Sequence, residues 1–289
     1  MVTLMKVLFS ILCLGLAAVG FNAAAQLTVD LSLDQQQFLP GEDLPVVVHV
    51  TNRSGQLLHL GDTGWLTFFI QADDGSVVAK KLDPPVTGLF DLNNSDMAIK
   101  HVNLGPYFAL QRTGTYHVTA TVHIGAWNAD ISSAPQKFDV IDGAELWSQS
   151  FGVSDPEMPD QPPRVRRYTL IEANYLKDQL RLYAQVSDEA NGSILAVRAL
   201  GNLISFSQPE AQLDRVSNLH VLCQTAATTF IHSVVSPGGK VIQKEYYDYV
   251  NTRPRLGLDN DGNIIVRGGV REPEPGQVPA VKSPDQLGR

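Results

Sequence analysis

Short runs in which hydrophobic and polar residues alternate fill the chain from residue 26 to residue 142. In the first run, Leu27, Val29, Leu31 and Leu33 alternate with polar residues, which is the period of a strand with one buried face. The same pattern predicts further strands at 45–52, 65–71, 76–80, 98–104, 116–124 and 136–141. About seven short strands without a helical period predict an all-β fold, a β-sandwich over residues 26–142.

In residues 164–271 the predicted strands are marked by hairpin turns. Three turns followed by β-branched residues predict hairpins, at Asn191-Gly192, Gly238-Gly239 and Asp261-Gly262. Asn-Gly and Asp-Gly are strong hairpin signals because their backbones accept a positive φ angle. A segment of about 108 residues is too short for a closed propeller of four or more blades. We therefore expect a second antiparallel β domain, either a small sandwich or two packed sheets.

Proline-rich segments separate and follow these two regions. Residues 154–163 contain four prolines and three acidic residues, a composition that resists helix and central strand alike. We predict a linker over 143–163. The segment 272–289 has four prolines and no apolar period, and we expect it to be disordered.

The N-terminus has the pattern of a secretory signal peptide. Lys6 precedes an apolar stretch over 7–21, and small residues follow at Ala23-Ala24-Ala25. We expect cleavage after Ala25, so that residues 1–25 are the signal peptide of a secreted or periplasmic protein. No later run reaches the roughly 20 apolar residues of a spanning helix, so we expect a protein that does not span the membrane. Cys223 is then the only cysteine of the mature chain, and no intramolecular disulfide is expected.

The charge differs between the two regions. The chain carries a net charge of −8, with hydrophobic residues at 44% and charged residues at 18%, as in soluble globular proteins. Residues 26–142 have a net charge of −7 and residues 164–271 a net charge of +3. A charge of +3 is too weak to indicate a nucleic-acid partner, but opposite signs would favour docking of one domain on the other.

One local motif carries a family resemblance. In the stretch from Leu110 to Val118, a Gly-x-Tyr sequence places Tyr116 at the start of a strand. Immunoglobulin-like sandwiches often have a tyrosine there, whose hydroxyl bonds back to the backbone of the preceding corner. Residues 26–142 resemble such modules of exported bacterial proteins, including bacterial proteinase-inhibitor sandwiches. The whole chain resembles a group of exported bacterial two-domain proteins, a likeness that implies no particular activity.

No set of residues forms a recognisable catalytic or metal-binding motif. The segment Asp259-Asn260-Asp261-Gly262-Asn263 begins like a calcium loop, but it lacks the glycine and glutamate that positions six and twelve require. We interpret this segment as a tight turn. There is no Gly-x-Ser-x-Gly motif, and Cys223 lies in an apolar strand. We therefore expect no catalytic residue, no metal site and no cofactor.

Two histidines lie on strands that pair in a predicted hairpin, His220 and His232. Imidazoles so placed could coordinate a ligand or titrate together. Solvent-facing structural histidines are the alternative that we favour.

Aromatic residues are the candidate binding residues: Trp65, Phe69 and Trp127. The strand that begins at Trp65 is apolar on both faces, so its second face must be covered by a loop, the other domain or a partner. Trp127 lies in the loop 125–130, where sandwich domains commonly display binding residues. Packing of Trp127 under that loop is the alternative that we favour.

The sequence thus favours a non-catalytic binding or scaffolding protein of the cell envelope, with a protein or an envelope polysaccharide as its partner. Two alternatives stay open. One is a proteinase inhibitor, which the sandwich resemblance implies, and the other is a hydrolase of unfamiliar design in the second domain.

Overall fold

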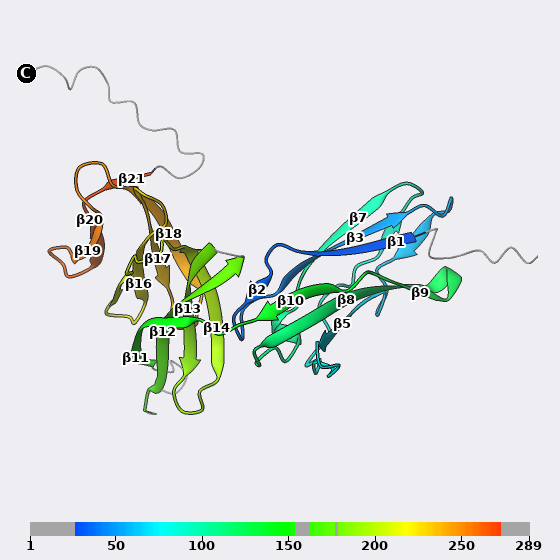
Figure 1. Cartoon of the computed structure of the whole chain (residues 1–289), viewed down its shortest axis with the longest axis horizontal. Helices are drawn as coiled ribbons and strands as arrows, with labels where there is room; N and C mark the ends of the chain where they lie inside the picture. Colours follow the sequence, from blue (N-terminus) through cyan, green and yellow to red (C-terminus); the bar gives the residue numbers. More distant parts are fainter. Residues whose placement is uncertain (1–26, 154–161, 177–178, 273–289) are drawn as a thin grey trace, which may run out of the picture.

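A computed structural model describes residues 27–153, 162–176 and 179–272 of the chain. Within these residues the regular elements are β-strands and two single-turn 3-10 helices, without an α-helix. Figure 1 shows two groups of sheets side by side. We name them the N-terminal unit (residues 27–140) and the C-terminal unit (residues 144–271). The predicted signal peptide and the residues 273–289 lie outside the described residues.

The N-terminal unit consists of two main sheets. One has the order β1-β3-β7 and the other the order β2-β10-β8-β5, with β9 pairing β8, and a small β4-β6 pair lies apart. All of these pairs are antiparallel except β2 with β10. The strands are β1 (Leu27–Leu33), β2 (Gln37–Phe38), β3 (Pro45–Asn52), β4 (Leu58–Leu60), β5 (Leu66–Ala72), β6 (Phe90–Leu92), β7 (Met97–Asn103), β8 (Gly114–Ile124), β9 (Ala129–Ser132) and β10 (Gln136–Val140).

Alternation of side chains puts one face of each sheet into a shared core. In β3, Val46, Val48 and Val50 are buried while the residues between them are half-buried. Ile70 of β5 and Val118 of β8 belong to the same cluster from the opposite sheet. The period of two in the sequence therefore identified the core face. The predicted strand 76–80 is the exception, since it forms only isolated bridges, Gln71 with Val77 and Lys80 with Phe108.

Two further antiparallel sheets form the C-terminal unit, in the orders β11-β12-β13-β14 and β15-β16-β17-β18-β21, and β19 and β20 form a separate hairpin. The strands are β11 (Ala144–Val153), β12 (Arg164–Leu176), β13 (Gln179–Asp188), β14 (Ile194–Asn202), β15 (Glu210–Leu213), β16 (Leu219–Gln224), β17 (Thr229–Val235), β18 (Val241–Asp248), β19 (Arg255–Leu258), β20 (Ile264–Arg267) and β21 (Val270–Arg271). Leu170 and Val186 from the first sheet share a core with Val221 and Val235 from the second. Two packed antiparallel sheets were one of the two predicted arrangements.

The three predicted hairpins are present. Asn191-Gly192 joins β13 to β14, Gly238-Gly239 joins β17 to β18, and Asp261-Gly262 joins β19 to β20. Gly192, Gly239 and Gly262 have φ angles of 69°, 80° and 78°. These are backbone conformations that glycine adopts without steric cost, which is why the dipeptides were informative.

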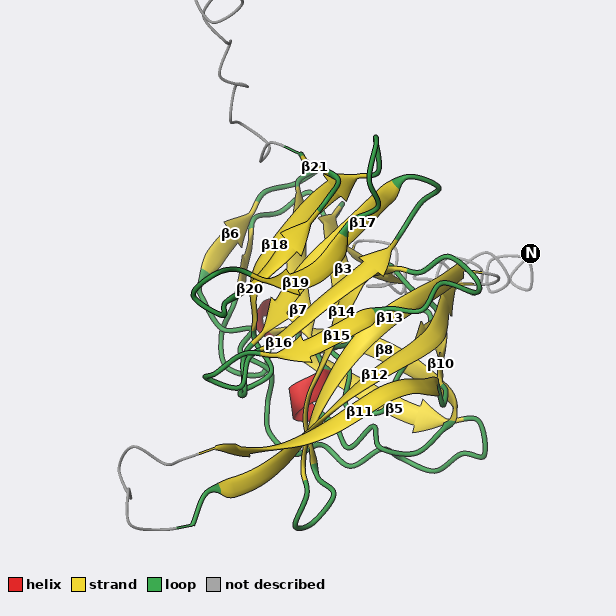
Figure 2. Cartoon of the chain, turned by 90° about the vertical axis from the view of Figure 1, so that its left-hand side faces the viewer, coloured by secondary structure: helices red, strands yellow, loops and turns green. Residues whose placement is uncertain are grey.

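The predicted linker over 143–163 needs correction. Residues 144–153 form β11, which pairs with β12 from Ala144 opposite Glu172 to Val153 opposite Arg164. The two strands run side by side as a long ribbon (Figure 2). Most of the proline-rich segment, residues 154–161, lies outside the described residues. The connection between the units is therefore the short segment 141–143, which precedes the proline-rich segment.

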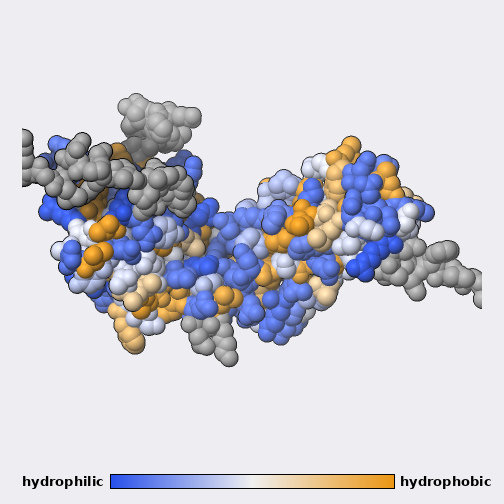
Figure 3. All heavy atoms as spheres, turned by 90° about the horizontal axis from the view of Figure 1, so that it is seen from above, coloured by the Kyte–Doolittle hydropathy of each residue, from blue (hydrophilic) through white to orange (hydrophobic). Residues whose placement is uncertain are grey.

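Leu39 of the N-terminal unit is buried against the C-terminal unit, in a cluster with Ala173, Tyr183 and Val197. Polar contacts surround this cluster. Arg198 forms an ion pair with Asp43 at 3.0 Å, Arg181 donates to Gln35 Oε1 at 2.8 Å, and the amide of Gln36 donates to the carbonyl of Tyr175 at 3.2 Å. In Figure 3 the middle of the molecule is mostly hydrophilic at its surface. An apolar contact with a polar rim thus joins the two units.

Candidate functional site

Trp65 belongs to the core of the N-terminal unit. Its side chain is 2% exposed, and its indole N–H donates to the carbonyl of Val86 at 2.8 Å. The ring of Phe90 contacts it edge-on, with 5.3 Å between the ring centroids. The loop that contains Val86 therefore covers Trp65, whereas Phe69, on the face for which a cover was predicted, is exposed. This burial removes Trp65 from the candidate binding residues.

Phe69 and Trp127 occupy separate places on the unit. Phe69 is 46% exposed and lies opposite Thr119 on the outer face of the sheet. Trp127 is half-buried in the 3-10 turn Gly125–Trp127 and packs against the core. Ile124, at the end of β8, lies five residues beyond Thr119, a distance of about 16 Å along the strand. The structure does not bring these two residues together as one site.

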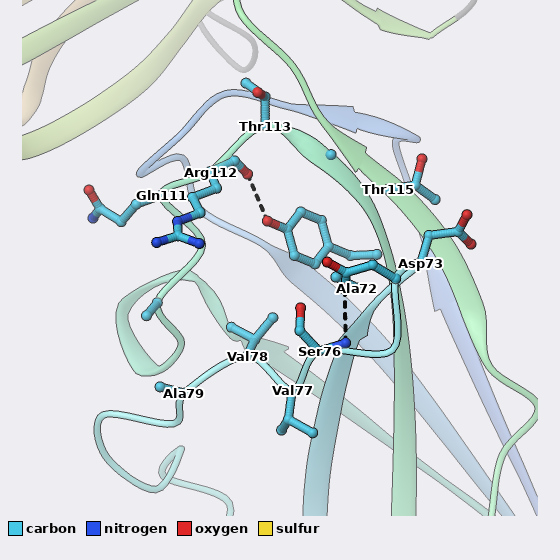
Figure 4. A pocket seen from close by; sticks show the side chains of 14 residues that line it. Ala72, Asp73, Ser76, Val77, Val78, Ala79, Gln111, Arg112, Thr113 and Thr115 are labelled. Carbon is cyan, nitrogen blue, oxygen red and sulfur yellow. Dashed lines mark hydrogen bonds between the residues drawn. The ribbon is translucent and has the colours of Figure 1, made fainter.

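A groove of about 790 Å³ opens on the N-terminal unit between two segments that are distant in the sequence. Residues of the segments 72–79 and 109–116 line it (Figure 4). We call it the Tyr116 groove. Residues 72–79 leave the end of β5 and turn back on its free edge, whereas residues 109–116 lead into β8.

Tyr116 is buried at the groove, and its ring stacks on Phe138 with 5.6 Å between centroids. Its hydroxyl donates to the carbonyl of Arg112 at 2.8 Å, the interaction drawn in Figure 4. This bond back to the preceding corner is the one that the Gly-x-Tyr motif predicted. It fixes the loop 112–115 and thereby one wall of the groove.

The other wall exposes backbone hydrogen-bonding groups. The amide of Val78 donates to the carbonyl of Ile70, and the amide of Ala72 donates to the carbonyl of Ser76, at 3.0 and 2.8 Å. Because backbone groups of successive extended residues point to opposite sides, the N–H and C=O of Val77 point away from β5. The carbonyl of Ala79, on that same side, accepts from the amide of Ala109 at 3.0 Å. Among the described residues, neither backbone group of Val77 has a hydrogen-bond partner.

Charged side chains flank the groove at both ends. Asp73 and Asp74 lie in the turn that follows β5, and Arg112 lies in the facing loop. Hydrogen bonds from the side chain and the backbone amide of Ser76 hold the pKa of Asp74 below its ordinary value. Asp74 is therefore ionised over the whole neutral range, and the groove presents acidic and basic groups to a ligand.

A chain of buried polar side chains crosses the second sheet of the C-terminal unit. His220 Nδ1 and His232 Nε2 lie 3.1 Å apart, and the two rings stack at 5.3 Å. Asp214 Oδ2 lies 3.5 Å from His220, and Glu245 Oε2 lies 3.7 Å from His232. Arg271 and Tyr247 both bond to Glu245, at 2.8 Å each. The predicted pairing of the two histidine strands is correct.

The expected solvent exposure of the two histidines is wrong. Their side chains are only 12% and 4% exposed, for His220 and His232. Leu222 and Val234, which share this face of the sheet, are buried as well. Desolvation by burial lowers the pKa of both imidazoles, and in His232 the neighbouring His220 lowers the pKa further. Both imidazoles are consequently neutral at pH 7.

The two remaining features singled out in the sequence, the turn at Asp259 and the thiol of Cys223, have structural roles. Asp259 accepts hydrogen bonds from the amides of Asp261 and Asn263, at 2.9 and 2.8 Å, as a tight turn requires. Cys223 is buried with a free thiol, and burial raises the pKa of that thiol to about 12. Within the described ranges no three side chains are grouped as metal ligands. None of the helical turns there is long and apolar enough to cross a bilayer.

Comparison with protein families and curated proteins identifies no relative of this chain. No protein-family model matches the chain, and no curated protein shows significant similarity to it.

The Tyr116 groove could be found only in part from the sequence. The Gly-x-Tyr motif signalled its tyrosine, but nothing local indicated that residues 72–79 would face it.

Proposed function

We propose that this chain is a non-catalytic binding protein of the cell envelope, and that the Tyr116 groove holds an extended segment of a partner protein. The observation that carries the proposal is the open backbone of Val77 beside the groove. An extended peptide can pair with exposed N–H and C=O groups as an added strand, and neighbouring pockets then select its side chains.

Several features of the groove suit such a ligand. Val77 is 62% exposed and lines the groove, so an incoming chain can reach this position. The loop 112–115 is fixed by the Tyr116 hydrogen bond, so the groove is formed in advance of binding. A preformed site reduces the ordering cost that binding must overcome. The acidic turn at Asp73 and Asp74, in a region of net charge −7, favours a segment with basic side chains.

We further propose an immunoglobulin-like assignment for the N-terminal unit. Two sheets around one core, the parallel pairing of β2 with β10, and the Tyr116 bond to the preceding corner support this assignment. Export is supported by the signal-peptide pattern over residues 1–25. In this interpretation the first unit displays its ligand site at a sheet edge, as binding modules do.

A backbone substitution tests the groove directly. Val77→Pro removes the N–H that would pair with a peptide, whereas Val77→Ala keeps it and serves as the matched control. The probe is a fluorescent decapeptide in which valine and threonine alternate with lysine, followed by anisotropy with the mature protein. We expect binding by the wild type and Val77→Ala, and at least about a tenfold weaker affinity for Val77→Pro.

Thermal unfolding of all three proteins checks that the fold is intact, because the amide of Val77 takes no part in the pairing with β5. Absence of peptide binding by the wild type would count against the proposal. Equal binding by Val77→Pro would also contradict it, since strand addition at this edge needs the amide.

A further inference from the structure

An exposed aromatic side chain stands at the end of a loop in the C-terminal unit. Phe206, between β14 and β15, is fully exposed at 104% and has a φ angle of 68°. A bulky side chain in the left-handed region is a steric outlier, and such strain is concentrated at binding and active sites. Neither the core nor the junction between the units accounts for Phe206.

Beside Phe206 lies a second pocket, of about 510 Å³. The loop 204–210 forms one side, and Gln224, Arg253 and Arg255 form the other. Its polar groups are hydroxyls, amides and guanidinium groups, together with one carboxylate, from Glu210. Two arginines and one glutamate give the lining a net charge of +1. The Oγ atom of Ser207 is buried and has no hydrogen-bond partner among the described residues.

Contacts to neighbouring side chains hold both guanidinium groups in place. Arg253 lies 5.2 Å from the centre of the Phe230 ring and donates to Gln224 Oε1 at 3.4 Å. Arg255 donates to Glu210 Oε1 at 3.2 Å, while Glu210 Oε2 accepts from the amide of Leu256 at 2.8 Å. Glu210 therefore offsets Arg255, and the charge of Arg253 is left for a ligand. A fixed guanidinium group is well suited to bind a carboxylate through two parallel hydrogen bonds.

We propose that this pocket binds an acidic sugar unit of a polysaccharide. The carboxylate of the sugar pairs with Arg253, and its hydroxyls bond to the exposed side chains of Ser205 and Gln208. The exposed ring of Phe206 covers the apolar face of the sugar. The site is separate from the Tyr116 groove and does not depend on the function proposed for that groove.

The composition of the pocket favours a glycan over a lipid surface. Aromatic rings, amides and hydroxyls together match a ligand that has both a flat apolar face and many hydroxyls. A membrane-binding surface instead needs a broad apolar face that enters the lipid, and Phe206 is the one fully exposed apolar side chain in this loop.

Calorimetry with a hexamer of galacturonic acid tests the proposal, with the neutral galactose hexamer as the control ligand. We expect the acidic hexamer alone to bind, with an affinity that falls as salt is raised. Arg253→Gln should weaken binding by about tenfold or more, because a charge-assisted pair is lost. Phe206→Gly should weaken it similarly while leaving the fold intact. Arg215→Gln removes an arginine of the same unit that donates to the carbonyl of Asp261, and it should leave the affinity unchanged.

Three results would overturn the proposal. They are no binding of the acidic hexamer, equal binding of the neutral hexamer, and equal weakening by Arg215→Gln. Vesicles of phosphatidylglycerol provide a further arm, since binding to vesicles without binding to the hexamer would assign Phe206 to a lipid surface. Val77→Pro should bind the hexamer as the wild type does, so a failure of the peptide groove is distinguishable from a failure of this pocket.

Discussion

His220 and His232 stack across β16 and β17, with Nδ1 of the first 3.1 Å from Nε2 of the second. Two neutral imidazoles can share one proton in such a contact, whereas two imidazolium ions would repel each other. Asp214 and Glu245 flank the pair, and Arg271 and Tyr247 bond to Glu245. Desolvation outweighs the attraction of the carboxylates, so that the pKa of both histidines falls below the ordinary value of 6.5.

Stability should therefore decrease in mild acid. The unfolded chain takes up protons at His220 and His232 at a higher pH than the folded chain does, so the free energy of unfolding falls as the pH drops below about 6.5. We expect the melting temperature to fall between pH 7.5 and pH 5. In His232→Gln this dependence should be weaker, although the variant is less stable overall. A melting temperature that stays constant over this range in the wild type would contradict the assignment.

Tyr116→Phe removes the hydroxyl that bonds to the carbonyl of Arg112 and leaves the ring in place. A typical hydrogen bond contributes about 1 kcal/mol to stability, and we expect a loss of that size in urea unfolding. Tyr107→Phe offers a control, since Tyr107 is half-buried in the same unit and is not part of this corner. Hydrogen exchange should also become faster at the amides of residues 112–115. An unchanged stability would show that the corner is held by packing alone.

Trp65→Ala should destabilise the N-terminal unit by about 3–5 kcal/mol, because it removes a large buried ring and leaves the carbonyl of Val86 without its donor. Phe69→Ala, at an exposed position of β5, the strand that begins directly after Trp65, should change the stability by less than about 1 kcal/mol. Chemical denaturation measures both values. Nearly equal effects would contradict the placement of Trp65 in the core.

Phe206→Gly provides an unusual test, because the predicted change in stability is opposite to that in binding. Glycine accepts a φ angle of 68° without steric cost, although it loses more chain entropy on folding. The free energy of unfolding should therefore stay the same or rise by up to about 1 kcal/mol. Differential scanning calorimetry can detect this change. A clear loss of stability would mean that Phe206 supports the fold and is not held in strain for a ligand.

Leu39→Ser should separate the two units without unfolding either. The substitution places a hydroxyl in the apolar cluster that joins them, where it finds no partner. Arg198→Gln removes only a half-exposed ion pair, worth about 0–1 kcal/mol, and should leave the units docked. Small-angle scattering should show a larger radius of gyration for Leu39→Ser alone. An equally compact Leu39→Ser protein would mean that other contacts hold the junction.

The sequence predicted those features that depend on nearby residues. The hairpins at Asn191-Gly192 and Asp261-Gly262 and the corner at Tyr116 follow from the backbone preferences of two or three residues. The alternating core face of β3 follows from the period of two. These are local rules, and the structure agrees with them.

Features that depend on distant contacts were missed. β11 was placed in the linker because its side chains do not alternate in burial, and its register shifts between Glu145 and Trp147. Burial of His220 and His232 depends on what covers the outer face of their sheet. The hairpin β19–β20 reaches that face through the bond from Leu256 to Glu210, and no local pattern indicated this. The facing walls of the Tyr116 groove lie thirty or more residues apart in the sequence.

The segment between β10 and β11 consists of Ile141, Asp142 and Gly143. A Cβ atom at Gly143 would lie 2.3 Å from Ile171 Cγ2 and 2.8 Å from the carbonyl oxygen of Glu172, so the chain enters the C-terminal unit pressed closely against β12. Across this three-residue connection, the apolar cluster around Leu39 and the ion pair of Asp43 with Arg198 dock the two units on each other. Whatever each unit captures is then held at a constant separation and angle, so that a protein on one side and a polymer on the other would be presented to each other at a fixed reach.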